Sequence, residues 1–245
     1  MAGPIWITGA SSGIGACLAQ LAPEGSRTIG ISRRPSAHGE HLAADLADPS
    51  SWELVRGEVE SVLDAERPRA ATFLHFAGAT APIGPAEAVD LDEYRASILL
   101  NSASGQILGA AFLSACAKRQ IAATLVICSS PGARTAQEGL APYCAGKAAL
   151  EHWTRGAALS LGSGPAEARL FSVVPWGVDT AMVREAMEIS SELLPLGARF
   201  RAAAAENRLA DPLDVAREIW DLVHSGEVEP GAAIDVGAVP SQPGG

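Results

Sequence analysis

One tyrosine and one lysine are spaced so that together they can move a proton. Tyr143 and Lys147 are four residues apart in a segment whose pattern predicts a helix, so their side chains share one helix face. A phenol titrates near pH ~10 in water, and a cation within reach lowers that pKa by roughly 1–3 units. We therefore expect Lys147 to make Tyr143 usable as an acid or a base near neutral pH.

The scarcity of both residue types makes this pair informative. The 18 basic residues include only two lysines, Lys118 and Lys147, and the chain has only two tyrosines. Chance alone predicts roughly 0.02 such pairs in this chain, although coincidence stays the plain alternative. Because arginine supplies nearly every other cation and does not easily relay a proton, a lysine at this position indicates a chemical role.

A glycine-rich turn near the start of the chain has the form of a phosphate-binding loop. Residues 8–15, TGASSGIG, follow a predicted strand and open a predicted helix. Glycine lets the backbone approach a phosphate closely, and the helix N-terminus offers free N–H groups to a pyrophosphate. The alternative is a turn that only joins strand to helix. The candidate cofactor contacts in this turn are Gly9, Ser11, Ser12, Gly13, Ile14 and Gly15.

Short apolar runs alternate with longer helical patterns along the chain. The predicted strands cover residues 5–8, 27–32, 41–45, 71–75, 122–128, 169–174 and 232–236. The main predicted helices cover residues 13–21, 50–65 (with Ser50 as N-cap), 91–118, 142–161 and 212–224. This alternation predicts an α/β fold, a doubly wound parallel sheet with helices on both faces, in a single domain over residues 1–245.

Composition excludes several classes of protein. Of the 245 residues, 48% are hydrophobic and 19% are charged, which is not the composition of a disordered chain. A net charge of −10 leaves no basic face for nucleic acid, and the four cysteines lack zinc-ligand spacing. We find no signal peptide and no apolar run of about 18 residues, so we expect a cytoplasmic protein with no metal and no membrane contact.

These features together resemble one enzyme family. The glycine turn and residues 143–147, YCAGK, are similar to the cofactor turn and the Tyr-x-x-x-Lys motif of the short-chain dehydrogenase/reductase family. The resemblance spans nearly the whole chain. Details such as TAPIGPAE and VDTAM look most like the branch that holds the benzil and sepiapterin reductases. It implies a Rossmann-type fold, a nicotinamide dinucleotide cofactor, and a carbonyl or alcohol substrate.

The resemblance also implies roles for residues outside the glycine turn. Ser130 matches the catalytic serine that holds the substrate carbonyl oxygen, and its neighbour Ser129 has the weaker claim. Asn101 matches the catalytic asparagine, which supports a proton relay to the lysine, and Lys147 would also bind the cofactor ribose. Tyr143 is a further implied cofactor contact. The others are Asp45 and Leu46 near the adenine, Ala77 and Gly78 after the fourth strand, and Pro175, Val178 and Thr180 after the sixth.

Two motifs depart from the family pattern. Residues 75–78, HFAG, stand where the family usually has Asn-Asn-Ala-Gly, which puts the polar links of that asparagine pair in doubt. His75 is either an acid–base residue or, as we favour, a strand-end histidine satisfied by backbone groups. In residues 175–180, PWGVDT, the glycine is displaced by one position, and Trp176 either lines the substrate pocket or packs the loop.

Two arginines follow the second predicted strand, where dinucleotide sites distinguish their cofactors. A site for NAD places an acid near this point to accept from the ribose hydroxyls. Arg33 and Arg34 instead suit a 2′-phosphate, because the guanidinium is a planar fork of donors; a solvated pair of loop arginines is the alternative. We therefore expect NADPH/NADP⁺ as the cofactor, with NADH less favoured.

Residues 176–210 form the one long insertion between a strand and the next clear helix, and the resemblance makes this segment the substrate lid. Met182, Val183 and Met187 recur there at helical spacing. Such a stripe is often plain core, but over a substrate site it favours an apolar or aromatic ketone or diketone. The expected substrate contacts are Ser130, Tyr143, Trp176, Met182 and Met187.

The sequence thus predicts an NADPH-dependent carbonyl reductase with a small-molecule carbonyl substrate. Hydride passes from the nicotinamide to the carbonyl carbon, and Tyr143 donates the proton. An NAD(P)-dependent alcohol dehydrogenase, a sepiapterin reductase and a non-catalytic dinucleotide sensor stay open as alternatives. Apolar residues on two predicted helices fit a homodimer or homotetramer as well as sheet packing. These residues are Leu99, Leu100, Leu108, Phe112 and Trp153.

Overall fold

The computed structural model describes residues 3–161 and 167–237, and in these residues seven parallel strands form one sheet. Their order is β3-β2-β1-β4-β5-β6-β7. The strands are β1 (Ile5–Thr8), β2 (Thr28–Ser32), β3 (Glu40–Ala43), β4 (Ala70–His75), β5 (Ala122–Cys128), β6 (Ala168–Pro175) and β7 (Ala233–Val236). The predicted doubly wound α/β fold is thereby confirmed.

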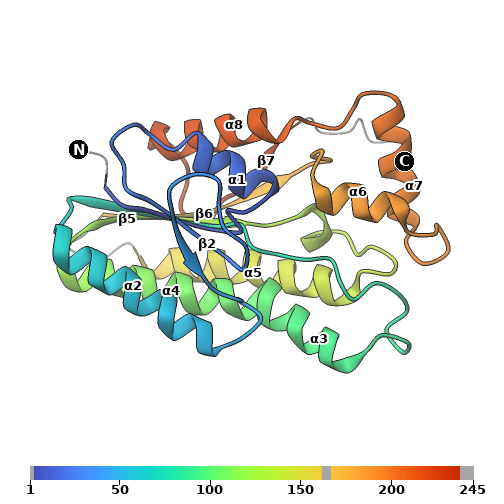
Figure 1. Ribbon diagram of the computed structural model, residues 1–245, viewed down its shortest axis with the longest axis horizontal. Helices are drawn as coiled ribbons and strands as arrows, with labels where there is room; N and C mark the ends of the chain where they lie inside the picture. Colours follow the sequence, from blue (N-terminus) through green and yellow to red (C-terminus); the bar gives the residue numbers. More distant parts are fainter. Residues whose placement is uncertain (1–2, 162–166, 238–245) are drawn as a thin grey trace.

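Helices cover both faces of this sheet (Figure 1). On one face lie α2 (Ser50–Glu66), α3 (Leu91–Ile98), α4 (Ser104–Arg119) and α5 (Ala141–Ser160). On the other face lie α1 (Gly13–Gln20) and α8 (Pro212–Ser225). Two further helices, α6 (Ala181–Glu188) and α7 (Pro195–Ala205), stand together at one end of the molecule.

The sheet is buried on both faces, which explains why its central strands read as continuous apolar runs. On one face Phe112 packs against Phe73 and Trp6, with ring centroids 5.5 Å and 6.0 Å apart. On the other face Trp220 of α8 donates from Nε1 to the Leu18 carbonyl of α1 at 3.1 Å. These two cores hold the strands, and with them the loops at their carboxyl ends.

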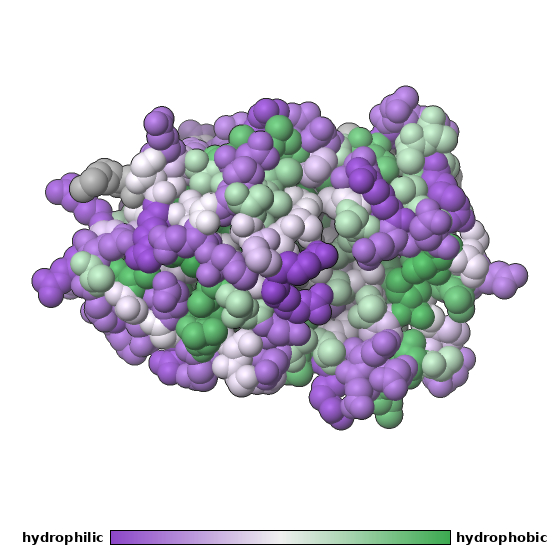
Figure 2. All heavy atoms as spheres, viewed as in Figure 1, coloured by the Kyte–Doolittle hydropathy of each residue, from purple (hydrophilic) through white to green (hydrophobic). Residues whose placement is uncertain are grey.

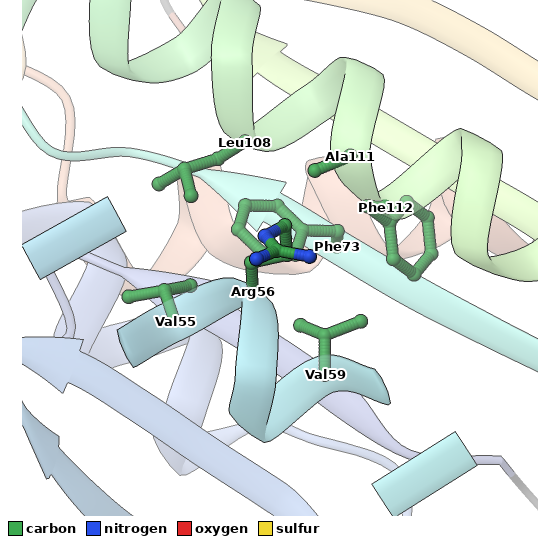
Figure 3. Close-up of a pocket in the computed structure, with 7 residues that line it drawn as sticks. All are labelled: Val55, Arg56, Val59, Phe73, Leu108, Ala111 and Phe112. Atoms are coloured by element: carbon green, nitrogen blue, oxygen red, sulfur yellow. The ribbon is translucent and has the colours of Figure 1, made fainter. Parts of the chain in front are cut away.

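The core between α2 and α4 is closed, as Figure 3 shows. Val55 and Val59 of α2 face Phe73, Leu108 and Phe112, and the gap between them leaves no room for a water molecule. Leu108 and Phe112 are at most 2% exposed. Of the two alternatives that the sequence left open for these residues, a subunit interface or packing on the sheet, the structure shows the second.

The long helical stretch predicted over residues 91–118 is not uniform. Five residues, η1 (Leu99–Ala103), form a π-helix between α3 and α4. Asn101 lies at its centre, fully buried, and its Nδ2 donates to the Ala79 carbonyl at 2.8 Å and to Ser97 Oγ at 3.0 Å. Its Oδ1 accepts from the Ala79 backbone N–H at 3.1 Å. An asparagine, which fits an α-helix interior poorly, thus sits in a local π-turn and holds the loop after β4.

The same stretch, Leu91–Arg119, is by length and composition apolar enough to cross a membrane, a property that the sequence reading missed. In the structure it is a core helix. Phe112, Ala115 and Cys116 of α4 are buried against the sheet. Its hydrophobicity is therefore explained by packing.

One helix start also differs from the prediction. α2 begins at Ser50 with Pro49 in the N-cap position, so Ser50 is not the cap. The Asp48 carboxylate accepts from the Ser50 backbone N–H at 2.9 Å and from its hydroxyl at 2.7 Å. Asp48, and not Ser50, therefore provides the side-chain acceptor at the start of α2.

Candidate active site

A cavity of about 940 Å³ opens at the carboxyl ends of the strands, beside the point where the strand order reverses between β1 and β4. A crevice at this point is where sheets of this type bind ligands. The glycine turn, the loops after β4, β5 and β6, and α5 to α7 form its walls. The predicted residues that line it are Gly9, Ser12, Gly13, Ile14, Gly15, Ala77, Gly78, Ser130, Tyr143, Lys147, Pro175, Trp176, Val178, Thr180 and Met182.

The glycine turn is shaped to bring backbone close to a ligand. Gly9 and Gly13 have φ angles of +73° and +54°, in the left-handed region that favours glycine. A Cβ atom at Gly9 would lie only 2.9 Å from the Phe76 carbonyl oxygen. The Ser12 side chain does not cap α1, so the first N–H groups of that helix face the cavity side free to bind an anion. The turn fits a dinucleotide pyrophosphate.

Tyr143 and Ser130 meet in the cavity wall. Both side chains line the cavity next to Gly132, where a Cβ atom would lie 3.4 Å from Ser130 Oγ and 3.7 Å from Tyr143 Cε1, and the Gly132 backbone N–H donates to Ser130 Oγ at 3.1 Å. Ser129 is oriented differently, because its hydroxyl donates to Glu151 at 2.8 Å. Of the two candidate serines, Ser130 is therefore the one placed to share a substrate oxygen with Tyr143.

Burial, rather than Lys147, dominates the electrostatics of Tyr143. Burial raises the pKa of the phenol above its ordinary value, and the nearby Ser130 hydroxyl acts in the opposite direction. Lys147 Nζ lies 5.9 Å from the centre of the phenol ring and donates to the Cys128 carbonyl at 2.8 Å. The effect of burial exceeds any lowering by Lys147, so the net decrease in the pKa of Tyr143 that we expected from the sequence is not seen. The phenol keeps its proton at neutral pH, which suits a proton donor.

Two glycines bring Asn101 and Lys147 close together. A Cβ atom at Gly78 would lie 3.1 Å from Asn101 Oδ1 and 3.4 Å from Lys147 Nζ. A Cβ atom at Gly146 would lie 2.9 Å from Asn101 Cβ, so glycine there lets α5 pack directly on the π-helix. Sequence reasoning missed this role of Gly146, although its place inside the YCAGK segment was a signal. Asn101 itself does not line the cavity.

His75 is a buried neutral histidine. Its Nδ1 lies 3.1 Å from Thr8 Oγ1, and its Nε2 lies 3.5 Å from Ser104 Oγ. Burial, with Lys147 nearby, lowers the pKa of His75 to about 3. The partners are hydroxyls and not the backbone groups that we expected. Thr8 Oγ1 also accepts from the backbone N–H groups of residues 76 and 77, at 3.0 Å each. The Thr8–His75 pair therefore supplies polar links in residues 75–78, where the sequence differs from the family pattern.

A buried carboxylate that sequence reasoning missed holds the serine loop. Glu151 of α5 is 5% exposed. It accepts from Ser129 Oγ at 2.8 Å and from Arg155 at 3.1 Å, and Arg134 Nε lies 3.5 Å away. Ser129 precedes Ser130, and Arg134 follows the short 3-10 turn η2 (Pro131–Ala133). Glu151 therefore fixes the loop that carries Ser130 on both sides.

The arginine pair lies beside the glycine turn but outside the cavity wall. Arg33 is 75% exposed, and its guanidinium is 4.0 Å from the Asp45 carboxylate. Ser36, in the same loop as Arg34, donates to the Ala10 carbonyl of the glycine turn at 3.2 Å and so ties the two loops together. The predicted contacts that do not line the cavity are Ser11, Arg33, Arg34, Asp45, Leu46, Asn101 and Met187.

The segment of residues 176–210, which we call the lid segment, covers one side of the cavity with α6 and α7 (Figure 1). Figure 2 shows hydrophobic side chains gathered below these helices, at the right of the view. Met182 and Ala186 of α6 line the cavity, whereas Met187 is half-buried outside it. The structure therefore does not bring the predicted contact Met187 to the site. Trp176 lies in the cavity wall.

Comparison with known proteins identifies the class. A family model described as enoyl-(acyl carrier protein) reductase matches residues 9–226. The chain belongs to the short-chain dehydrogenase/reductase family, whose members are NAD(P)-dependent oxidoreductases, and the predicted resemblance is confirmed. It is similar to two curated proteins named benzil reductase ((S)-benzoin forming). The relative from Bacillus cereus is 26% identical over 242 residues, 94% of this chain and 97% of the relative. That from Bacillus subtilis is 26% identical over 235 residues, 94% and 96% of the two chains.

Solved structures show the same fold at lower identity. A short-chain dehydrogenase/reductase from Saccharomyces cerevisiae has a TM-score of 0.80 at 19% identity and covers 96% of both chains. The ligand-free aldohexose dehydrogenase of Thermoplasma acidophilum has a TM-score of 0.79 at 21% identity, covering 95% of this chain and 91% of its own. A variant of the actinorhodin polyketide ketoreductase, solved with NADPH, has a TM-score of 0.79 at 22% identity over 97% and 96% of the chains.

Proposed function

We propose that this protein is an NADPH-dependent carbonyl reductase for an apolar or aromatic ketone or diketone. The observation that carries the proposal is that Tyr143 and Ser130 lie together in the cavity wall, with Lys147 Nζ 5.9 Å from the centre of the Tyr143 ring. The names of the two benzil reductase relatives support a diketone as the type of substrate. The bound cofactor would supply a hydride to the carbonyl carbon.

The chain's own residues would supply the proton and the geometry. Ser130 donates a hydrogen bond to the substrate oxygen, and Tyr143 transfers its phenolic proton to that oxygen as the new C–H bond forms. One hydride and one proton convert the ketone to a secondary alcohol. The ammonium of Lys147 stabilises the phenolate that remains and binds the ribose, and Asn101 holds the adjoining loop and supports proton return.

The cofactor would lie along the glycine turn with its nicotinamide end at Tyr143. Gly9, Gly13 and Gly15 allow the close approach of the pyrophosphate, and Arg33 and Arg34 would bind the 2′-phosphate of NADP. An NADPH-bound ketoreductase of the same fold supports this choice. The proposal also places the protein in the cytoplasm, as a single domain over residues 1–245 with a lid. The exposed apolar side chains of Ile107 on α4 and Leu159 on α5 could pack at the interface of a homodimer or homotetramer.

The main alternative is an NAD(P)-dependent alcohol dehydrogenase, which uses the same residues in reverse. Oxidation needs Tyr143 as a base, yet burial raises its pKa and favours the protonated phenol. Tyr143 is thus ready as a proton donor, whereas the cofactor ratio and the equilibrium set the direction of the reaction. A dinucleotide sensor needs neither a proton donor such as Tyr143 nor a hydroxyl such as that of Ser130 to hold a substrate oxygen.

The proposal is tested by following NADPH consumption with benzil, aromatic ketones and sepiapterin, with NADH in parallel. We expect consumption with benzil and NADPH, and a lower kcat/KM with NADH. Binding of NADPH without consumption of any of these ketones would favour the sensor.

The arginine pair should decide the cofactor preference. Changing Arg33 and Arg34 together to Ala is expected to raise the KM for NADPH about 10- to 100-fold, because charge-assisted hydrogen bonds to the 2′-phosphate are lost. The KM for NADH should change little. Changing Arg67 and Arg69 to Ala, near the start of β4, removes the same charge as a control. Equal changes in the KM for NADPH and the KM for NADH would show that the arginine pair does not bind the 2′-phosphate.

Glu151 should act as a positioning residue for Ser130. Glu151→Ala is expected to lower kcat about 10- to 100-fold at unchanged NADPH affinity, because the serine loop loses its anchor. Glu151→Gln keeps an acceptor for Ser129 and should recover part of the rate. Arg155→Gln, which removes an exposed partner only, is the control. A wild-type kcat in the alanine variant would contradict this role.

A further inference from the structure

One face of α7 is turned toward the cavity. Leu196, Arg199, Phe200 and Ala203 line it, at the i, i+3, i+4 and i+7 spacing of a single helical face. Such a face is normally apolar throughout when it covers an apolar cavity. Arg199 is the cation that interrupts it.

Contacts on the other sides of α7 hold this face in place. Gly197 lies against the Ala186 carbonyl of α6, where a Cβ atom would overlap, so the two helices are in direct contact. Arg201, on a different face from Arg199, binds the Met187 carbonyl and donates to Ser191 Oγ at 2.7 Å. The position of Arg199 toward the cavity therefore follows from how the lid segment packs.

Arg199 forms no ion pair or hydrogen bond with the residues that the structure describes, 3–161 and 167–237. The other charges of the cavity wall are accounted for. Arg208 Nε lies 2.6 Å from the Glu206 carboxylate, and Lys147 donates to the Cys128 carbonyl. Arg199 thus brings an uncompensated positive charge to the lid side.

The wall around this charge is apolar. A hydrophobic cluster surrounds the Tyr143 ring, and its members that also line the cavity are Leu140, Leu194, Leu196 and Phe200. A chain of net charge −10 repels anions at long range, so an anionic ligand needs a local cation. Arg199 is an exposed side chain that lines the cavity beside this cluster, and a guanidinium binds a carboxylate by two parallel hydrogen bonds.

We propose that the natural substrate is an apolar or aromatic ketone that also carries a carboxylate, and that Arg199 binds this carboxylate. The ketone oxygen would meet Ser130 and Tyr143, and the apolar part would lie against the cluster around Phe200. The inference rests on the proposed reductase function and narrows its substrate class to oxo acids.

The test compares acids with their neutral esters. Benzoylformate, 3-benzoylpropionate and 4-benzoylbutyrate share a phenyl ketone and differ in the distance from ketone to carboxylate, and each has a methyl ester without the charge. We expect Arg199→Gln to lower the acid-to-ester ratio of kcat/KM about 10- to 100-fold for the best acid. Arg217→Gln, which removes the same charge from a paired position on α8 outside the cavity wall, should leave that ratio unchanged.

Two further readings make the outcome decisive. Calorimetric titration of 4-hydroxy-4-phenylbutyrate with NADP⁺ present should show an affinity that falls in Arg199→Gln and not in Arg217→Gln. Benzil serves as the neutral reference. If benzil is reduced but the ratio is the same in wild type and Arg199→Gln, the oxo-acid inference is wrong and the reductase stands. If NADPH binds and neither benzil nor any acid or ester is reduced, the proposed function fails and this inference fails with it.

Discussion

Tyr143→Phe is expected to abolish ketone reduction in a protein that still folds and binds NADPH. The change removes the proton donor, and positioned acid–base groups contribute roughly 10²- to 10⁴-fold to rate, so we expect kcat to fall about 10³-fold. Tyr143 lines the cavity beside Ser130, and phenylalanine fills the space of its ring. The free energy of unfolding should therefore change by no more than about 1 kcal/mol. Steady-state rates, NADPH titration and thermal melting measure the three quantities.

Tyr94→Phe is the matched control, because Tyr94 is the other tyrosine and lies on α3, away from the cavity wall. Since burial raises the pKa of Tyr143, the wild-type reduction rate should stay level through neutral pH and decline only in the alkaline range. A rate that rises with pH through neutrality would mean that the phenolate is needed. A phenylalanine variant with more than a tenth of the wild-type kcat would remove Tyr143 from the chemistry.

Lys147→Met should have the second largest effect. Lys147 is 3% exposed, and its ammonium lies behind Tyr143 while donating to the Cys128 carbonyl. Removing a charged donor from a buried site typically costs about 10²- to 10³-fold in rate, and we expect a fall of that size in kcat/KM. The Kd for NADPH should rise about 10-fold or more, because the proposed contact with the ribose is lost.

The control for Lys147 is Lys118→Met, which removes the other lysine from an exposed position at the end of α4. It should leave kcat/KM and the Kd for NADPH unchanged. Lys147→Arg should recover little of the wild-type kcat/KM, since the planar guanidinium of arginine does not fit a site built around a compact ammonium. Full activity in the arginine variant would show that a positive charge of any shape suffices.

The fold was predictable because its signals are local. Strands buried on both faces read as continuous apolar runs, and the glycine turn directly follows the first of them. The spacing of Tyr143 and Lys147 likewise depends on one helix only, so their shared face follows from the sequence. Strand limits in the structure differ from the predicted ones by two residues at most.

The features that were missed depend on contacts between distant segments. Glu151 is informative only once α5 lies against the serine loop, and Gly146 only once the π-helix lies against α5. The raised pKa of Tyr143 reflects the segments that pack around the phenol in the cavity wall, which no spacing reveals. The sequence left Phe112 open between a subunit interface and the core, because an apolar helix face has the same pattern whether it packs on a sheet or on a second subunit.

The central claim is that this chain delivers a hydride from NADPH to a ketone carbon and a proton from Tyr143 to its oxygen. Incubation with benzil and NADPH that carries deuterium at the transferable position of the nicotinamide tests it most directly. We predict a product alcohol with one deuterium on the carbinol carbon for the wild-type protein, and almost no product for Tyr143→Phe. Oxidation of NADPH without deuterium in the alcohol, or equal labelled product from both proteins, would contradict it.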